Sequence, residues 1–467
     1  MLQTETPINF AALFQKQQAK SRELRTGKIA ERKQKLKQIK NWLITNQEEI
    51  RAAEYADLRK PAEEVNVTEL YPMLTEVRHA IRKVKRWSSP SRIATSLTFL
   101  GTRARIYNEP KGASLIISPW NYPMLLAIGP LISAVAAGCT VALKPSEFTP
   151  HTNKVIGQMI SDLFVPEEVT MIEGEADVAA GLLNQPFDHI FFTGSPAVGK
   201  IVMEAAAKNL TSVTLELGGK SPTIIDETAN IKDAAEKITW GKWTNAGQTC
   251  IAPDYLFVHE SKKEQLIEAI KEQAQKLYAD QANYAAIINE RHFQRLESSF
   301  QDGLDKGAKV VFGGEFDQEQ VRISPTIVTD LNTDMTLLQE EIFGPFLPIL
   351  TYKNLDEVLK YINDRPKPLA LYVYSRRKKN QQKIIQETSS GGVVINDNIL
   401  QFGHPHLPMG GVNNSGIGKA HGREGFLAFS HPKSVLKQRV GLTIVKTVYP
   451  PYTGLKKKMI ELMLKYF

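Results

Sequence analysis

Only two cysteines, Cys139 and Cys250, occur among the 467 residues of this chain. So few cysteines cannot form a disulfide framework, and they fit a reducing, cytoplasmic environment in which at least one is available as a reactive thiol. The sequence also has no repeat at a fixed period and no low-complexity tract, which argues against a solenoid or a fibrous protein. A chain of this length is too long for one ordinary core, so two or three domains are expected.

Targeting and membrane-spanning segments are not expected either. Residues 1–9 have neither a basic start nor an apolar core, so they do not resemble a signal peptide. Residues 124–143 are uncharged, but Gly129-Pro130 and Gly138 interrupt them and Lys144 follows directly. A buried helix followed by a buried strand explains this stretch better than a membrane span.

Charge is unevenly distributed along the chain. The formal net charge is +8, and residues 16–40 hold ten Lys or Arg against two acidic residues. Such a run could bind nucleic acid or an anionic membrane. However, Leu24, Ile29, Leu36 and Ile39 recur at helical spacings, which favours solvated helix faces. We therefore expect no nucleic-acid partner.

Hydrophobic patterning predicts an α/β protein. Several helices are expected within residues 10–87, with breaks near Pro61 and Pro72. Segments 93–99 and 103–107 alternate as a hairpin would, and this hairpin could be an arm that pairs with another subunit. Short apolar strands then alternate with helices, which indicates a parallel, doubly wound sheet. These strands are expected at 114–117, 140–143, 169–172 and 190–192.

A second α/β unit is expected after Gly219. Its predicted helices are 231–243, 262–278, 355–363 and 377–388, and its predicted strands are 255–258, 309–312, 370–374 and 393–395. The glycine-rich segment 409–425 then leads to a last predicted strand, 435–440. Residues 455–467 form a basic amphipathic helix with a stripe of apolar side chains at spacings of three and four.

The stretch from Val213 to Cys250 contains two residues with the chemistry of a nucleophilic enzyme. Glu216 stands between Leu215 and Leu217, where apolar surroundings would raise its pKa toward that of a general base. Cys250 ends Gly247-Gln248-Thr249-Cys250, a small polar turn from which a thiolate could reach a ligand. Taken alone, each residue is more simply explained as structural: a buried, hydrogen-bonded glutamate and a structural thiol.

Three further segments lie where strands are expected to end. Asn121, in Ser118-Pro119-Trp120-Asn121, offers amide donors that could stabilise an oxyanion. Lys144 and Glu147 could hydrogen-bond a ribose, with the Glu147 carboxylate repelling a 2′-phosphate. The run from Gly194 and Ser195 to Gly199 leads into a helix whose first amides could meet a pyrophosphate, although it is not a GxGxxG pattern.

In this order the segments SPWNYP, KPSE, FTGSPAVGK, ELGGKSP, GQTC and EEIFGP resemble the aldehyde dehydrogenase superfamily over nearly the whole chain. The short amino end and the segment VVINDNIL are similar to its class-3 branch, which includes the fatty aldehyde dehydrogenases. Where that branch commonly reads PFGGVGNSG, this chain has PMGGVNNSG, so Met409 and Asn413 depart from it near the expected substrate entrance.

The resemblance implies a fold with a Rossmann-type parallel-sheet NAD domain (1–91 and 109–218), a second α/β catalytic domain (219–411) and a small β oligomerisation arm (92–108 and 430–446). It implies Cys250 as nucleophile, Glu216 as general base and Asn121 in the oxyanion hole. The residues expected to bind NAD, with NADP as the alternative cofactor, are Lys144, Glu147, Gly194, Ser195, Gly199, Glu341 and Phe343. No metal is expected. The site must favour the Cys250 thiolate, through local dipoles and the positively charged cofactor ring.

The expected reaction is the oxidation of a medium- or long-chain aliphatic aldehyde, or of an aromatic one, to its acid through a thioester. Relatives with the same fold reduce acyl phosphates or pass the acyl group to coenzyme A. Glu216 favours hydrolysis, because those acceptors need no base to activate water. A basic binding protein without activity would be a different class, and the set of Asn121, Glu216, Cys250 and Glu341 argues against it. A cytoplasmic homodimer is expected, with possible peripheral membrane contact through the C-terminal helix.

Overall fold

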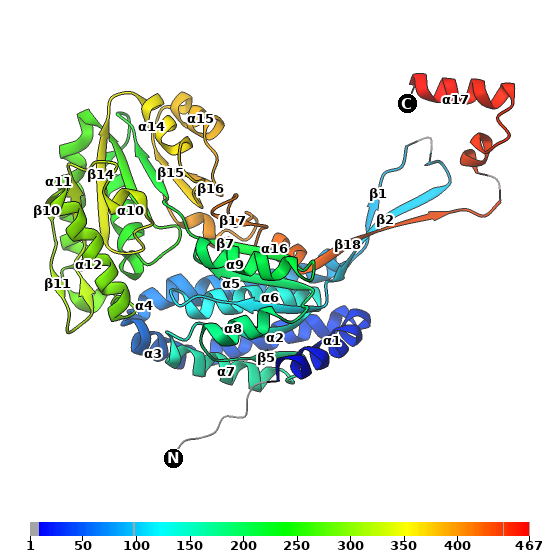
Figure 1. Ribbon diagram of the computed structural model, residues 1–467, viewed down its shortest axis with the longest axis horizontal. Helices are drawn as coiled ribbons and strands as arrows, with labels where there is room; N and C mark the ends of the chain where they lie inside the picture. The colour runs from blue at the N-terminus through cyan, green and yellow to red at the C-terminus, as the bar shows by residue number, and fades with distance from the viewer. Residues whose placement is uncertain (1–8, 97–98, 442, 467) are drawn as a thin grey trace, which may run out of the picture.

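The computed structural model describes residues 9–96, 99–441 and 443–466. Two sheets form the body of the molecule, and a narrow arm projects from it (Figure 1). The first sheet has the order β17-β7-β6-β3-β4-β5, with all pairs parallel except β17–β7. Its strands are β3 (Ala113–Ile117), β4 (Thr140–Lys144), β5 (Val169–Met171), β6 (His189–Gly194), β7 (Ser212–Leu217) and β17 (Gly416–Ile417). The predicted parallel sheet is confirmed.

Helices from the amino end and from the crossovers cover this sheet. They are α1 (Phe10–Thr26), α2 (Ile29–Thr45), α3 (Gln47–Leu58), α4 (Ala62–Val65), η1 (Asn66–Leu70), α5 (Tyr71–Ser88), α6 (Pro123–Ala137), α7 (Pro150–Leu163), α8 (Ala176–Leu183) and α9 (Pro196–Ala207). The predicted break at Pro61 is confirmed. The break predicted at Pro72 is wrong, because η1 continues into α5 and Pro72 lies in the first turn of α5, where a missing N–H costs little.

The uncharged stretch 124–143 is a buried helix followed by a buried strand, as predicted. Within it, α6 and β4 pack in one apolar core together with α2, α5 and α7. Gly138 ends α6 with φ +93, and a side chain there would collide with the Arg32 guanidinium. Among the helices of the described residues, none combines the length and the apolar composition needed to cross a membrane.

The second sheet has the order β10-β13-β14-β9-β8-β15-β16, parallel except for the β10 edge. Its strands are β8 (Pro222–Ile225), β9 (Tyr255–His259), β10 (Lys309–Phe312), β13 (Thr326–Thr329), β14 (Phe346–Tyr352), β15 (Ala370–Tyr374) and β16 (Gly392–Ile395). The helices of this unit are α10 (Ile231–Trp243), α11 (Lys263–Tyr278), α12 (Glu290–Asp305), α13 (Thr336–Gln339), α14 (Leu355–Asn363) and α15 (Lys378–Glu387). The predicted ranges differ from these by no more than one residue at either end.

The arm is built differently from the predicted hairpin. Its middle strand, β2 (Thr102–Pro110), pairs along its whole length with β18 (Ser430–Gln438), while β1 (Ser91–Ile93) pairs with only three residues of β2. The predicted strand 93–99 is therefore wrong for residues 94–96 and 99, and its residues 97–98 lie outside the described part of the chain. The last strand begins five residues before the predicted 435–440 and ends at Gln438. Pairing with β18 already satisfies one edge of β2, so no long hairpin partner is needed.

Beyond β18 the chain passes through η7 (Ile444–Val448) to α17 (Gly454–Tyr466), which confirms the predicted C-terminal helix over the described residues. Figure 1 shows α17 beyond the tip of the arm, away from both sheets. Leu455, Leu462, Leu464 and Tyr466 of α17 are exposed. The helix therefore has an uncovered apolar surface in this chain.

Candidate active site

Asn121 lies at the carboxyl-terminal edge of the first sheet, where parallel sheets bind ligands. It follows β3, whose neighbours β4 and β6 are parallel, so the carboxyl ends of all three strands meet here. The side chain is 3% exposed, and its Nδ2 donates to the carbonyl oxygen of Gln248 at 3.0 Å. An amide has two N–H donors. One is used to orient the group, and the other is available to a ligand.

The loop that carries Cys250 has a forced backbone. It begins at η3 (Thr244–Gly247), where Asn245 and Ala246 adopt positive φ values of 53° and 52°. Gly247 also has positive φ, and a Cβ there would lie 2.3 Å from the carbonyl oxygen of Gly344, so only glycine fits. Gln248 is fully buried, donates to Ala286 O at 2.9 Å and accepts from Ile288 N at 3.0 Å. The loop is thus fixed on the amino-terminal side of the thiol.

One cavity of about 620 Å³ brings most of the predicted site residues together. Both α/β units contribute to its walls. Its lining includes Asn121, Gly194, Ser195, Glu216, Cys250, Glu341 and Phe343. Lys144, Glu147 and Gly199 are not among the lining residues.

Each of the three other predicted residues has a local contact. The Lys144 Nζ lies 3.2 Å from Glu147 Oε2 and donates to Pro145 O at 3.0 Å, at the end of β4. The Lys144 side chain is 4% exposed and that of Glu147 36% exposed. A Cβ on Gly199 would meet the Leu217 side chain at 2.7 Å, so Gly199 allows α9 to lie close to β7. Their roles in cofactor binding stay predictions.

Burial sets the protonation of the acidic groups in the cavity. Glu216 is 9% exposed, and its Oε1 has no hydrogen-bond partner among the described residues. Burial raises the pKa of Glu216 to about 8, against an opposing effect of Lys419. Burial, with the nearby Asp254, likewise raises the pKa of Glu341 to about 8. A carboxyl group with a pKa near 8 suits a general base at neutral pH.

The protein's own groups do not favour the Cys250 thiolate. This corrects the expectation that local dipoles help to stabilise the thiolate. Burial raises the pKa of the Cys250 thiol to about 12, and the neighbouring Glu341 and Glu216 raise it further than burial alone. Backbone N–H groups of Cys250 and Ile251 act in the opposite direction, so the predicted local dipoles exist but are outweighed. Thiolate formation therefore needs a positive charge from outside the protein, or removal of the proton as the bond forms.

Two features of the site were missed at the sequence level. An apolar funnel of about 160 Å³ also reaches Cys250. Its walls come from η1, α5, α6, α10 and η6 (Leu400–Gly403), and its apolar lining residues include Val67, Tyr71, Leu125, Trp240, Ile399 and Phe402. These residues are scattered over more than 300 positions, so no local signal marks them. The second feature is an aromatic contact: the rings of Trp120 and Phe343 meet edge-to-face at 5.3 Å.

A half-buried thiol, an oriented amide donor and a carboxyl group of raised pKa in one cavity are the groups that an enzyme with a cysteine nucleophile requires. Comparison with known families matches residues 3–435 to the aldehyde dehydrogenase family. The chain belongs to this family.

Individual relatives agree with this assignment. The chain is 42% identical to 4,4'-diaponeurosporen-aldehyde dehydrogenase of Staphylococcus aureus, over 97% of each chain. It is 43% identical to aldehyde dehydrogenase family 3 member A2 of Mus musculus, over 90% of this chain and 87% of the mouse protein, which supports the class-3 branch. A solved structure of the substrate-bound state of Staphylococcus aureus AldH superimposes with a TM-score of 0.94 at 41% identity, over 98% of this chain and 100% of that one.

Proposed function

We propose that this protein oxidises aldehydes to carboxylic acids with a nicotinamide cofactor, using Cys250 as nucleophile, Asn121 as oxyanion donor and Glu216 as general base. The observation that carries the proposal is the single cavity that holds all three residues beside Ser195, Glu341 and Phe343. Membership of the aldehyde dehydrogenase family supports it independently.

In the first half-reaction the Cys250 thiol loses its proton to solvent as Sγ bonds to the aldehyde carbon, and the carbonyl oxygen becomes an oxyanion. The free N–H of the Asn121 amide and the backbone N–H of Cys250 hold this oxygen. Stabilisation by one such donor is worth about 2.7–4 kcal/mol in other enzymes. Return of the electron pair from the oxyanion expels hydride from carbon and leaves a thioester on Cys250.

In the second half-reaction Glu216 removes a proton from water, whose oxygen attacks the thioester carbon. The carbon–sulfur bond breaks, the acid leaves and Cys250 regains a proton. A small cavity of about 40 Å³ lies between Glu216 and Cys250 and is large enough for water. Transfer of the acyl group to coenzyme A or phosphate is disfavoured, since neither acceptor needs a base such as Glu216, whose Oε1 has no hydrogen-bond partner among the described residues.

The residues present fit a dinucleotide. The amino end of α9 opens onto the cavity at Gly194 and Ser195, and the first amides of a helix bind a pyrophosphate well. Lys144 and Glu147 would hold the adenosine ribose, while Glu341 and Phe343 would place the nicotinamide. When bound, NAD supplies the acceptor for the hydride. The carboxylate of Glu147 would repel a 2′-phosphate, so NAD is expected to be preferred over NADP.

The apolar funnel supports a medium- or long-chain aldehyde as substrate. Its interior is lined by aliphatic and aromatic side chains, and Tyr71 and Leu400 extend the apolar surface to its exposed rim. The diaponeurosporen-aldehyde named for the staphylococcal relative is in keeping with such a lining.

We also propose a homodimer in which the arm β1-β2-β18 contacts the partner subunit. The apolar stripe of α17 would cover the funnel mouth of the partner or lie on a membrane surface at the cytoplasmic side, since within its own chain α17 lies away from α5 and α10, which line the funnel (Figure 1). Light scattering of the purified protein measures the oligomeric state directly.

The proposed function is tested by following NADH formation with a series of aldehydes of increasing chain length. We expect activity with NAD, acid as the product and kcat/KM that increases with chain length. Acyl-coenzyme A formation in place of the acid would show that the thioester is transferred, and absence of NADH formation across the series would refute the proposal.

A further inference from the structure

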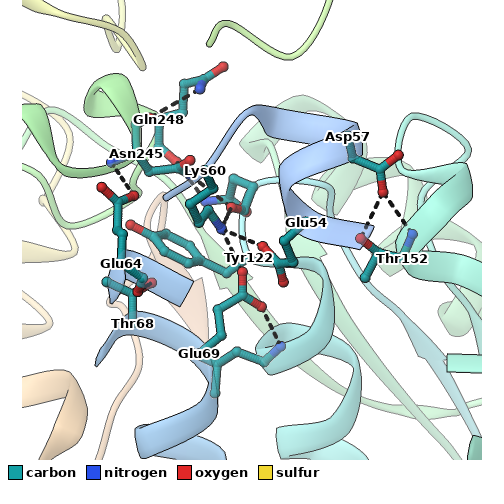
Figure 2. Close-up of polar contacts among 12 residues, drawn as sticks. Glu54, Asp57, Lys60, Glu64, Thr68, Glu69, Tyr122, Thr152, Asn245 and Gln248 are labelled. Atoms are coloured by element: carbon teal, nitrogen blue, oxygen red, sulfur yellow. Dashed lines mark hydrogen bonds and ion pairs between the residues drawn. The ribbon is translucent and has the colours of Figure 1, made fainter. Parts of the chain in front are cut away.

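A cluster of buried charges lies directly behind the catalytic loop, in a part of the chain without any of the sequence motifs. Its centre is Lys60, which follows the left-handed Arg59 at the end of α3. Lys60, Glu54 and Glu69 are all fully buried, and the Lys60 Nζ lies 2.8 Å from Glu54 Oε2 and 2.6 Å from Glu69 Oε1 (Figure 2). Replacing such a buried cluster by apolar residues is often neutral or stabilising. Stability alone therefore does not explain it.

The third donor of the ammonium group points to the active site. Lys60 Nζ donates to the backbone carbonyl oxygen of Asn121 at 3.3 Å. An ammonium group has three N–H donors, so Glu54, Glu69 and Asn121 saturate it. Lys60 also lies 4.6 Å from the ring centroid of Tyr122, whose hydroxyl is 2.6 Å from Thr249 Oγ1, next to Cys250.

A second carboxyl group from the same segment holds the loop of the thiol. Glu64 Oε1 accepts from the backbone N–H of Asn245 at 2.9 Å, at the residue whose positive φ begins the loop (Figure 2). The Asn245 side chain then donates to Asn121 O at 2.8 Å and to Gln248 O at 3.3 Å. Gln248 O is also the acceptor that orients the Asn121 amide. Asn121 is thus linked to the loop of Cys250 through hydrogen bonds with Asn245 and Gln248. Lys60 donates to the Asn121 end of this network, and Glu64 accepts from its Asn245 end.

We propose that Lys60 and Glu64 are positioning residues, which set the oxyanion donor of Asn121 and the thiol of Cys250 at the right separation for one carbonyl group. Lys60 acts through the backbone of Asn121, and Glu64 acts through Asn245. The inference rests on the proposed roles of Asn121 and Cys250, and it adds that an amino-terminal segment outside the catalytic motifs sets their geometry. Val67 and Thr68 of η1, between Glu64 and Glu69, line the funnel, so substrate contacts and the positioning residues share one short segment.

The test uses the full-length protein and the acylation of Cys250 by p-nitrophenyl acetate, which needs the oxyanion donor but neither NAD nor an aldehyde. Glu64→Leu removes the acceptor for Asn245 N–H, whereas Glu64→Gln keeps an oxygen there. We expect Glu64→Leu to lower the acylation rate constant about ten- to hundredfold, the scale of a misplaced catalytic group. Glu64→Gln should stay within about threefold of the unaltered protein. Alkylation of Cys250 by iodoacetamide forms no oxyanion and should change far less than acylation.

Lys60 is tested as Lys60→Met combined with Glu69→Gln. Burial raises the pKa of Glu54 well above its usual range, so Glu54 stays neutral when Lys60 is replaced, and no buried carboxylate is left without its cation. The same loss of acylation is expected, with little change in the concentration of ester that gives half-maximal rate. Asp57→Ala is the matched control. Asp57 is on α3, the helix that also carries Glu54. It accepts three hydrogen bonds, from His151 N, Thr152 N and Thr152 Oγ1, on the side away from the catalytic loop (Figure 2).

Asp57→Ala should lower the melting temperature but leave acylation within about twofold. Equal loss of acylation in Asp57→Ala would assign the effect to stability and overturn the proposal. So would folded Glu64→Leu and Lys60→Met/Glu69→Gln variants that acylate at the normal rate. Should the unaltered protein acylate normally yet oxidise no aldehyde, the proposed function fails while the positioning role is still measured.

Discussion

Replacing Glu216 by Gln separates the two half-reactions. Gln keeps the shape of the side chain, and since Glu216 Oε1 has no partner among the described residues, no hydrogen bond of that oxygen is lost. Hydride transfer should continue at nearly the normal rate, because Glu216 takes no part in the attack of Cys250 on the aldehyde. Hydrolysis of the thioester should fall by about 10²- to 10⁴-fold, the usual contribution of a general base. The variant should therefore give a burst of one NADH per active site and then a slow steady rate.

The pH dependence of thioester hydrolysis provides a second, independent test of the role of Glu216. With a pKa of about 8, Glu216 is about one-tenth ionised at pH 7 and about nine-tenths ionised at pH 9. Only the ionised form accepts a proton from water, so thioester hydrolysis in the unaltered protein should rise about tenfold from pH 7 to pH 9 and level off above. In Glu216→Gln the slow steady rate should lose this rise between pH 7 and pH 9.

Rapid-mixing measurements of NADH absorbance at several pH values resolve the burst from the steady rate. Equal loss of the burst and the steady rate would mean that Glu216 acts before the thioester forms, and would refute the assignment. A steady rate in the unaltered protein that does not change between pH 7 and pH 9, with hydrolysis shown to be rate-limiting, would refute the raised pKa.

Three further outcomes are expected. Cys250→Ala should abolish both aldehyde oxidation and p-nitrophenyl acetate hydrolysis while NAD still binds, as measured by calorimetry; substantial oxidation by this variant would exclude Cys250 as the nucleophile. Glu147→Gln should narrow the preference for NAD over NADP, measured as the ratio of kcat/KM, because the repulsion of a 2′-phosphate is lost; stronger use of NADP by the unaltered protein would contradict this. Ending the chain after Thr453 removes α17 and should raise KM for long aldehydes, by a factor that corresponds to at most about 0.8 kcal/mol of binding free energy per buried methylene. KM for short aldehydes should not change. An equal loss of activity on long and short aldehydes in a folded protein would make α17 purely structural.

The sequence alone singled out the residues of the expected chemistry, but not the residues that hold them in position. Glu216 and Cys250 stand out because their neighbours along the chain already show an apolar strand and a glycine-led turn. Lys60 could not be recognised in this way. It is separated by 61 residues from Asn121, and in the sequence it is one of many lysines in a polar helical region. Its burial results from packing between α3, η1 and α6, and no residue spacing reports that packing.

The same reasoning explains the error in the arm. Alternating polarity in residues 93–99 is equally compatible with a strand and with an exposed connection. What decides is the partner, and β2 pairs with β18, more than 300 residues later in the chain. Long-range pairing of this kind leaves no signal within either segment.

Cys250, Glu216 and Glu341 line one cavity, and each of the three has a raised pKa because loss of solvent penalises its charged form. The two carboxyl groups also raise the pKa of the thiol, since a second negative charge close by costs more than the first. Such a cavity holds one negative charge at a time at low cost. The proposed reaction needs no more than this. The negative charge forms on the oxygen of the carbon bonded to Cys250 and is lost as hydride leaves, and only then does Glu216 have to ionise. Burial thus keeps the base neutral while the thiol reacts, so the two groups that share the site do not oppose one another.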